Sequence, residues 1–328
     1  MKLTRTEVIA LANQKGGCGK TTTAVNLAAA LAKAGYEVCL VDIDAQCNAT
    51  ENLGVDLEEH DRARRFTVVD AFASKKPARE IAMRLENRGG GRLAIVPGSR
   101  GVSAVPHKLE AQVRATVADA DGSELDADDL KDEQRMRFRT SLDTLRDTYD
   151  FVIIDTPPEL GFIMTSGLIA ADSYIIPVTP SGYDLKGLEK LDRNVKKVRS
   201  RYNPSLRLLG VLVGRYDART KLDADIAKML RDSFGKELVF DTVIRQSAKI
   251  RQATVYGETI FEHADDDRSA EGFLALAHEI VAKLNAAEPL PADAGAGSGV
   301  GQGAPAGSTP DAAELEPDSP ELMEANRG

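Results

Sequence analysis

The chain has 328 residues, of which 42 % are hydrophobic and 28 % charged, the balance of a globular protein with a sizeable core. Its formal net charge of −9 is concentrated in segments 119–133 and 286–328, each with eight acids and one base, so the rest of the chain is net +5 and can carry a basic face. No apolar run approaches the ~18 residues of a membrane span, no export signal opens the chain, and the three cysteines form no C-x-x-C pair. These features exclude a membrane-spanning or disulfide-stabilised secreted protein, and we expect a cytoplasmic protein with no membrane partner.

Short apolar runs rich in Val and Ile alternate with longer amphipathic segments. The expected strands are Glu7–Ala12, Glu37–Ile43, Leu93–Val96, Phe151–Asp155, Ser173–Val178 and Leu208–Val213. The expected helices are Lys20–Ala34, Asp132–Thr148, Gly161–Ala170, Leu185–Arg201, Leu222–Phe234 and Ser269–Asn285. Most of the strands are continuously apolar, which is typical of a sheet covered on both faces. The alternation predicts an α/β fold over residues 1–285, with a doubly wound, mainly parallel sheet flanked by helices.

The two acidic segments stand apart from this pattern. Residues 119–133 read as an acidic surface insertion between two helices. Residues 286–328 are rich in Ala, Gly, Pro and acids and contain no aromatic residue, so they cannot bury enough apolar surface to offset the cost of ordering. We expect a disordered tail there, without the basic amphipathic stripe of a membrane-surface helix.

A glycine-rich loop joins the first expected strand to the first expected helix. Glycines let backbone N–H groups converge on phosphate oxygens, and the helix N-terminus adds the positive end of its dipole. In such a loop Lys20 reaches the β- and γ-phosphates, and the Thr21 hydroxyl holds Mg²⁺. The predicted nucleotide-binding residues are Lys15, Gly16, Gly17, Cys18, Gly19, Lys20, Thr21 and Thr22.

Three carboxylates lie at the carboxyl ends of expected strands. Asp42 and Asp44 lie on the same side of the second strand, because side chains alternate along a strand, and both can face a nucleotide bound beside it. Asp155 ends four apolar residues, as a Walker B aspartate does when it delivers a carboxylate to Mg²⁺. The alternative for Asp155 is a residue that only caps the following helix.

The phosphate loop departs from the usual G-x-x-x-x-G-K-[ST] pattern, since Gln14 replaces a glycine and Lys15 precedes the glycines. It resembles the deviant Walker A box K-G-G-x-G-K-T-T of the ParA/MinD family of ATPases. This resemblance implies that the cofactors are ATP and Mg²⁺. It also implies that Lys15 crosses the interface of a nucleotide-sandwiched homodimer to contact the partner's phosphates.

The segment after the second strand resembles the same family's D-x-D-P-Q-G-N-A-T box. The resemblance implies that Asp44 engages the attacking water, while Asp42 lies near Mg²⁺. Ala45 and Cys47 stand where the family has proline and glycine. The metal candidates are therefore Thr21, Asp42 and Asp155, and the catalytic candidates are Asp44 and Lys15.

The resemblance extends through most of residues 6–285 and is strongest to the ParA-type (Soj-like) partition ATPases. It implies a slow ATPase that dimerises on ATP, coats DNA without sequence preference, associates with the nucleoid, and is released when a ParB-like or cargo-adaptor protein stimulates hydrolysis. Arg219 matches a DNA-contacting arginine of these proteins, and Lys249 falls where they have a second one. Cobyrinate-type amide ligases of the wider family are not expected, because they need a glutaminase domain for which the chain has no room.

The DNA-binding face and the cargo leave alternatives open. A basic stripe on the helix Leu185–Arg201 is compatible with phosphate binding, but equally with an ordinary solvated helix face. Its members are Lys186, Lys190, Arg193, Lys197 and Arg201. Two rival functions also stay open: a positioning ATPase for a protein organelle or cluster, and an ATP-timed regulatory protein that does not bind DNA.

Overall fold

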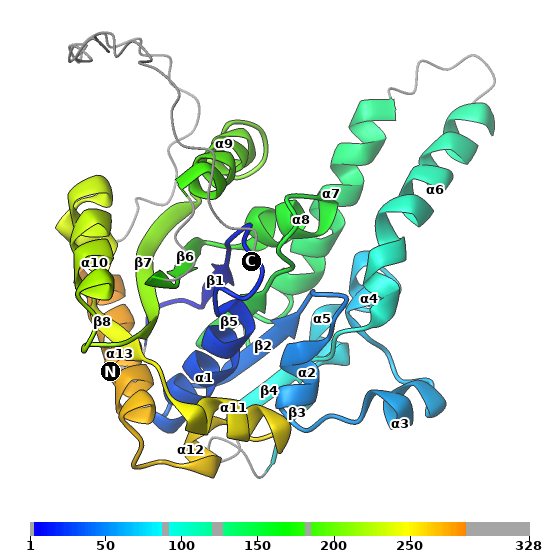
Figure 1. The fold of residues 1–328 in the computed structure, drawn as a ribbon. Helices are drawn as coiled ribbons and strands as arrows, with labels where there is room; N and C mark the ends of the chain where they lie inside the picture. Colours follow the sequence, from blue (N-terminus) through cyan, green and yellow to red (C-terminus); the bar gives the residue numbers. More distant parts are fainter. Residues whose placement is uncertain (1–2, 87–91, 120–126, 181–184, 287–328) are drawn as a thin grey trace, which may run out of the picture. The chain divides into compact units, whose positions relative to one another are not determined.

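The computed structural model describes residues 3–86, 92–119, 127–180 and 185–286. Within them the strands form one sheet in the order β3-β4-β2-β5-β1-β6-β7-β8 (Figure 1). Their bounds are β1 (Glu7–Leu11), β2 (Val38–Asp42), β3 (Met83–Arg84), β4 (Leu93–Val96), β5 (Phe151–Asp155), β6 (Ser173–Val178), β7 (Arg207–Tyr216) and β8 (Val239–Arg245). All neighbouring strands pair in parallel except β3 and β4, so the predicted doubly wound, mainly parallel sheet is confirmed.

Helices cover both faces of this sheet. Their bounds are α1 (Lys20–Lys33), α2 (Asn48–Asn52), α3 (Leu57–Arg62), α4 (Val68–Phe72), α5 (Ala78–Ile81), α6 (Val105–Asp119), α7 (Ala127–Asp143), α8 (Phe162–Ala170), α9 (Leu185–Arg201), α10 (Lys221–Phe234), α11 (Ala248–Val255), α12 (Ile260–His263) and α13 (Arg268–Ala286). The 3-10 helices η2 (Arg100–Ala104) and η4 (Lys236–Leu238) complete the described elements. Among these residues, no helix combines the length and apolarity that a membrane span requires.

Alternation along the strands divides the core into two layers. In β1, Val8 and Ala10 face a layer built with side chains of α4 to α10, whereas Ile9 and Leu11 face a layer built with α1, α12 and α13. Both layers are fully buried at β1, which explains why the central strands are apolar without interruption. Because the paired strands are parallel, the carboxyl ends of β1, β2, β5, β6, β7 and β8 share one edge of the sheet, where ligands bind in such folds.

Most expected elements are present within one or two residues, but two expectations need correction. The strands β3 and β8, which lie at the two edges of the sheet, were not expected, and neither were the helices α2 to α6, α11 and α12. The acidic segment 119–133 is not an insertion throughout. Residues 127–133 form the first two turns of α7, which packs against α6 (Figure 1), and the part 120–126 lies outside the described residues. Acidic residues near a helix N-terminus favour the helix, because they interact with the positive end of its dipole.

The expected acidic tail, 286–328, falls outside the described residues except for Ala286, the last residue of α13.

Candidate functional site

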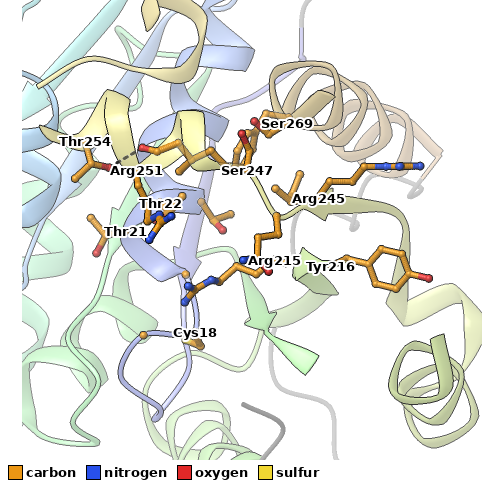
Figure 2. Close-up of a pocket in the computed structure, with 18 of the residues that line it drawn as sticks. Cys18, Thr21, Thr22, Arg215, Tyr216, Arg245, Ser247, Arg251, Thr254 and Ser269 are labelled. Atoms are coloured by element: carbon orange, nitrogen blue, oxygen red, sulfur yellow. Dashed lines mark hydrogen bonds between the residues drawn. The ribbon is translucent and has the colours of Figure 1, made fainter. Parts of the chain in front are cut away.

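A large cavity opens at the carboxyl edge of the sheet. Its volume is about 1190 Å³, enough for a nucleotide, and its walls come from the phosphate loop, the end of β7, the segment from β8 into α11 and the start of α13. Figure 2 shows the phosphate loop and these walls around the same space. The predicted residues Gly16, Gly17, Cys18, Gly19, Lys20, Thr21, Thr22 and Asp44 all line it.

The phosphate loop adopts a backbone that requires its glycines. Gly17 has φ 71° and Gly19 has φ 91°, both in the left-handed region that favours glycine. A Cβ added to either residue would meet no atom within 4 Å, so the conformation rather than crowding demands glycine. Gly19 directly precedes α1, whose unpaired N–H groups and dipole therefore face the cavity.

The two lysines of the loop have different surroundings. Lys20 is 6 % exposed and lines the cavity, with its Nζ 3.4 Å from the Lys15 carbonyl oxygen. Lys15 is exposed and is not among the residues that line its own cavity. Its backbone N–H donates to Oδ1 of the buried Asn13, whose Nδ2 donates to the Pro177 carbonyl at the end of β6. Asn13 thus ties the start of the loop to the sheet.

Asp42 is the last residue of β2 and Asp44 follows two positions later, but only Asp44 lines the cavity. Asp42 is fully buried and its carboxylate accepts three hydrogen bonds: from the Thr50 N–H at 2.9 Å, the Thr50 hydroxyl at 2.7 Å and the Asp44 N–H at 3.2 Å. Burial nevertheless raises the pKa of Asp42 to about 6. The Gly98 N–H donates to the Thr50 hydroxyl oxygen and fixes its orientation toward Asp42.

Asp155 has the environment expected of a cation ligand. It is fully buried, and neither of its carboxylate oxygens has a hydrogen-bond partner. Burial raises the pKa of Asp155 well above its usual value, and the charge of Asp42 raises it further. The Thr21 hydroxyl and the Lys20 ammonium lie close enough to offset part of this shift. A buried carboxylate with two orphaned oxygens beside a phosphate loop fits Mg²⁺, which prefers carboxylate and phosphate oxygens.

The turn after Asp44 shows how the chain accommodates its departure from the family pattern. Cys47 stands at a position of φ 56°, directly before α2, where a glycine would be unstrained. Its side chain is buried, and burial raises its pKa to about 12. The turn is closed by the Cys47 N–H donating to the Asp44 carbonyl and the Gln46 N–H donating to the Asp44 carboxylate. Asp44 therefore keeps its place at the rim of the cavity.

Of the two residues expected to contact DNA, Arg219 lines the same cavity as Asp44, whereas Lys249 is not among the residues that line it. Arg219 follows β7 and is highly exposed, and its guanidinium makes a two-point ion pair with Asp217 at 2.9 and 2.7 Å. Lys249 is exposed on the first turn of α11. On α9 the stripe residues that the structure describes are exposed, but Arg201 pairs with Asp132 at 2.6 Å.

Sequence reasoning missed several residues of the site. Thr50 lies within the box that contains Asp42 and Asp44, so its place in the motif was a usable signal. Gly98 and Asn13 have roles that depend on contacts between distant segments, which no spacing reveals. The arginines Arg215 and Arg251 enter the cavity from β7 and α11, and nothing in the local sequence marks either of them.

Comparisons with known proteins agree with this geometry. A family described as an AAA domain matches residues 6–208. The chain is 38% identical over 279 residues to the chromosome-partitioning ATPase Soj of Thermus thermophilus, which covers 85% of this chain and 97% of that protein. It is 32% identical over 278 residues to the chromosome partitioning protein ParA of Caulobacter vibrioides, covering 84% of this chain and 94% of that one.

A solved structure resembles the chain with a TM-score of 0.67 and 25% identity: cobyrinic acid a,c-diamide synthase from Mycobacterium smegmatis with bound ATP analog and magnesium. The match covers 88% of this chain and 100% of that one. Chain length therefore does not separate the two proteins, and the argument from lack of room for a further domain was wrong. What separates the two possibilities is sequence identity, which is higher to the partition proteins than to the synthase.

Proposed function

The chain belongs to the ParA/MinD family of P-loop ATPases, and we propose that it is a ParA-like switch whose ATP-bound homodimer coats DNA and is released on hydrolysis. Its cofactors are ATP and Mg²⁺. The cargo is a DNA locus that the cycle segregates or positions, and the ATP-bound form associates with the nucleoid. The ATPase corresponds to residues 1–285, and 286–328 is an accessory tail.

The observation that carries the dimer is the position of Lys15. Its neighbours Gly16 to Thr22 line the cavity, whereas Lys15 is exposed outside it. A lysine anchored through its backbone to Asn13 but not used by its own site is available to the phosphates of a facing subunit. ATP then stabilises the dimer, because Lys15 gains this contact only in the dimer, and hydrolysis removes it.

In this proposal each carboxylate has a separate task. Asp44, at the rim of the cavity, orients water for in-line attack. Thr21 and Asp155 hold Mg²⁺, and Asp42, fixed by Thr50, lies behind them. When bound, Mg²⁺ neutralises charge on the phosphate oxygens. The unassisted reaction is slow, and an activating ParB-like or cargo-adaptor protein accelerates it.

Oligomeric state with ATP tests the dimer. Asp44→Ala, which blocks hydrolysis, is expected to accumulate as an ATP-dependent dimer in size-exclusion chromatography with light scattering. Adding Lys15→Ala should return it to the monomer without loss of nucleotide binding, while Lys75→Ala, which removes an exposed lysine from the turn after α4, should not. A monomeric Asp44→Ala protein at saturating ATP would refute the proposed switch.

DNA binding is tested separately, with a duplex of arbitrary sequence in a gel-shift assay. ATP-loaded Asp44→Ala should bind at low salt and dissociate as salt rises, because phosphate contacts release counterions. Arg219→Glu should abolish binding and keep the dimer. Absence of binding at low salt would favour the rival function, an ATP-timed regulatory protein. Retained DNA binding with a protein-cluster cargo would favour the other rival, an organelle-positioning ATPase.

A further inference from the structure

The wall of the cavity opposite the phosphate loop carries two arginines from elements far apart in the chain. Arg215 lies near the end of β7 and Arg251 lies on α11, and both line the cavity together with Gly16 to Thr23. In Figure 2 the side chains of Arg215 and Arg251 extend toward the phosphate loop, near Cys18 and Thr22, whereas those of Arg245 and Tyr216 point away from it. Two guanidinium groups therefore converge on one part of the cavity.

The backbone at Arg215 has a strained conformation. Arg215 has φ 53°, a left-handed conformation that a non-glycine residue seldom adopts. It coincides with an irregularity of the β7–β8 pairing between Val213 and Tyr216. A bulge of this kind next to an active site redirects a side chain. Arg215 stands within this irregularity, and its side chain extends toward the phosphate loop (Figure 2).

Neither arginine is neutralised by a carboxylate within the described part of the chain. Four acids line the cavity. Asp217 is held by Arg219, and Asp267 accepts hydrogen bonds from the N–H and hydroxyl of Ser269. Neither Asp44 nor Asp266 forms an ion pair with either arginine in the described residues. Two cations that face the same space repel each other unless an anion lies between them. The arrangement therefore points to a bound anion, and guanidinium groups are well suited to phosphate.

We propose that Arg215 and Arg251 form a two-arginine clamp on the α-phosphate of the bound nucleotide. This inference rests on the proposed nucleotide site. Lys20 reaches the β- and γ-phosphates and the loop amides cradle the α- and β-phosphates, and the cavity continues from the loop toward β7 and α11. The phosphate that leaves the loop on that side is the α-phosphate. The clamp therefore holds ATP and ADP equally and keeps the nucleotide bound after hydrolysis.

The test measures nucleotide affinity with fluorescent ADP and ATP analogues, using the full chain with Lys15→Ala so that ATP does not drive dimerisation. Arg215→Met and Arg251→Met keep the side-chain length but remove the charge. Each should lower the affinity for ADP and the affinity for ATP by the same factor, about 10-fold or more. Arg245→Met is the matched control, because that arginine lines the same cavity but points away, and it should bind as the parent does.

Three results would overturn the clamp: no change in Arg215→Met and Arg251→Met, a loss confined to ATP, or an equal loss in Arg245→Met. If the parent protein binds no nucleotide, the proposed function fails first, so the two failures are distinguishable. Arg215→Gly adds an independent readout. Because glycine tolerates φ 53°, this variant should melt at a higher temperature than Arg215→Met and still bind ADP as weakly.

Discussion

Asp42 and Asp155 are register partners on the parallel strands β2 and β5, so two fully buried carboxylates lie side by side beneath the phosphate loop. They are not equivalent. Asp42 accepts three hydrogen bonds and is fixed, whereas both oxygens of Asp155 are unpartnered. The pair stores an unfavourable interaction in the nucleotide-free protein that a cation would relieve, as is common where a site is organised for binding rather than for stability.

Asp155→Asn should stabilise the nucleotide-free protein at neutral pH and impair Mg²⁺-dependent ATP hydrolysis. Burial raises the pKa of Asp155 in the folded chain, so the folded state keeps a proton that the unfolded chain releases above about pH 4. The wild-type protein therefore loses stability as pH rises through the raised pKa, whereas the amide does not titrate. We expect a gain on the order of 1–3 kcal/mol in urea unfolding at pH 8 that shrinks toward pH 5.

The exposed Asp147→Asn is the control for this experiment, since it removes the same charge outside the site. If Asp155→Asn raises the free energy of unfolding equally at every pH, or no more than Asp147→Asn does, the buried charge of Asp155 is not what destabilises the wild-type protein.

Gly98→Ala should disturb the site through contacts with Asp42 and Thr50. A Cβ at position 98 would lie 2.9 Å from Cγ and Oδ2 of Asp42, closer than real Cβ contacts, and 3.2 Å from the Thr50 hydroxyl oxygen, which is tighter than most. Asp42 is fully buried and held by Thr50, so it cannot yield without losing hydrogen bonds. We expect a loss of about 1–3 kcal/mol in unfolding free energy and a lower ATPase rate.

Gly101→Ala serves as the matched control for that variant, because its Cβ would meet only the Ser99 hydroxyl at 3.3 Å and a Val69 methyl at 3.6 Å. Equal unfolding free energies for the two alanine variants would show that the contact of the new Cβ with Asp42 and Thr50 does not destabilise the protein.

The central sheet and the ends of its strands could be predicted from sequence because they depend on local patterns. Strands such as β5, covered on both faces, are uninterrupted apolar runs, and Asp155 stands where such a run ends. The edge strands β3 and β8 were missed for the opposite reason. β3 has two residues, and the residues of β8 alternate between buried and exposed surroundings without a clean period. Their pairing is decided by the neighbouring strands rather than by their own composition.

The same division holds within the site. The glycine-rich loop and Asp44 are adjacent to strands in the sequence, and a motif spacing locates them. The clamp residues Arg215 and Arg251 are brought together only by the fold, one by a left-handed residue in β7 and the other by α11. A left-handed arginine leaves no signature in the sequence, because glycine or asparagine is the usual marker of that conformation.

Cys47 offers a direct measure of backbone strain in the turn after Asp44. Cys47→Gly and Cys47→Ala both delete the buried thiol, but only glycine relieves the φ of 56°. At an ordinary position alanine is the more stabilising residue, because glycine loses more conformational entropy on folding. Here we expect the order to reverse, with Cys47→Gly more stable than Cys47→Ala by about 1 kcal/mol in urea unfolding. Alanine at or above glycine would mean that the turn carries no such strain.

Asp217→Asn should strengthen DNA binding if Arg219 is a DNA contact. In the free protein Asp217 holds the Arg219 guanidinium through two short bonds, and this ion pair lowers the pKa of Asp217 to about 2, so the carboxylate is charged at any physiological pH. DNA phosphates must compete with it. Removing that charge should tighten binding of the ATP-loaded protein about 2- to 5-fold at low salt, with the difference shrinking as salt rises. Asp232→Asn, an exposed acid on α10, removes the same charge elsewhere and should have a smaller effect. Equal gains in the two variants would indicate a general electrostatic effect and would count against a specific contact by Arg219.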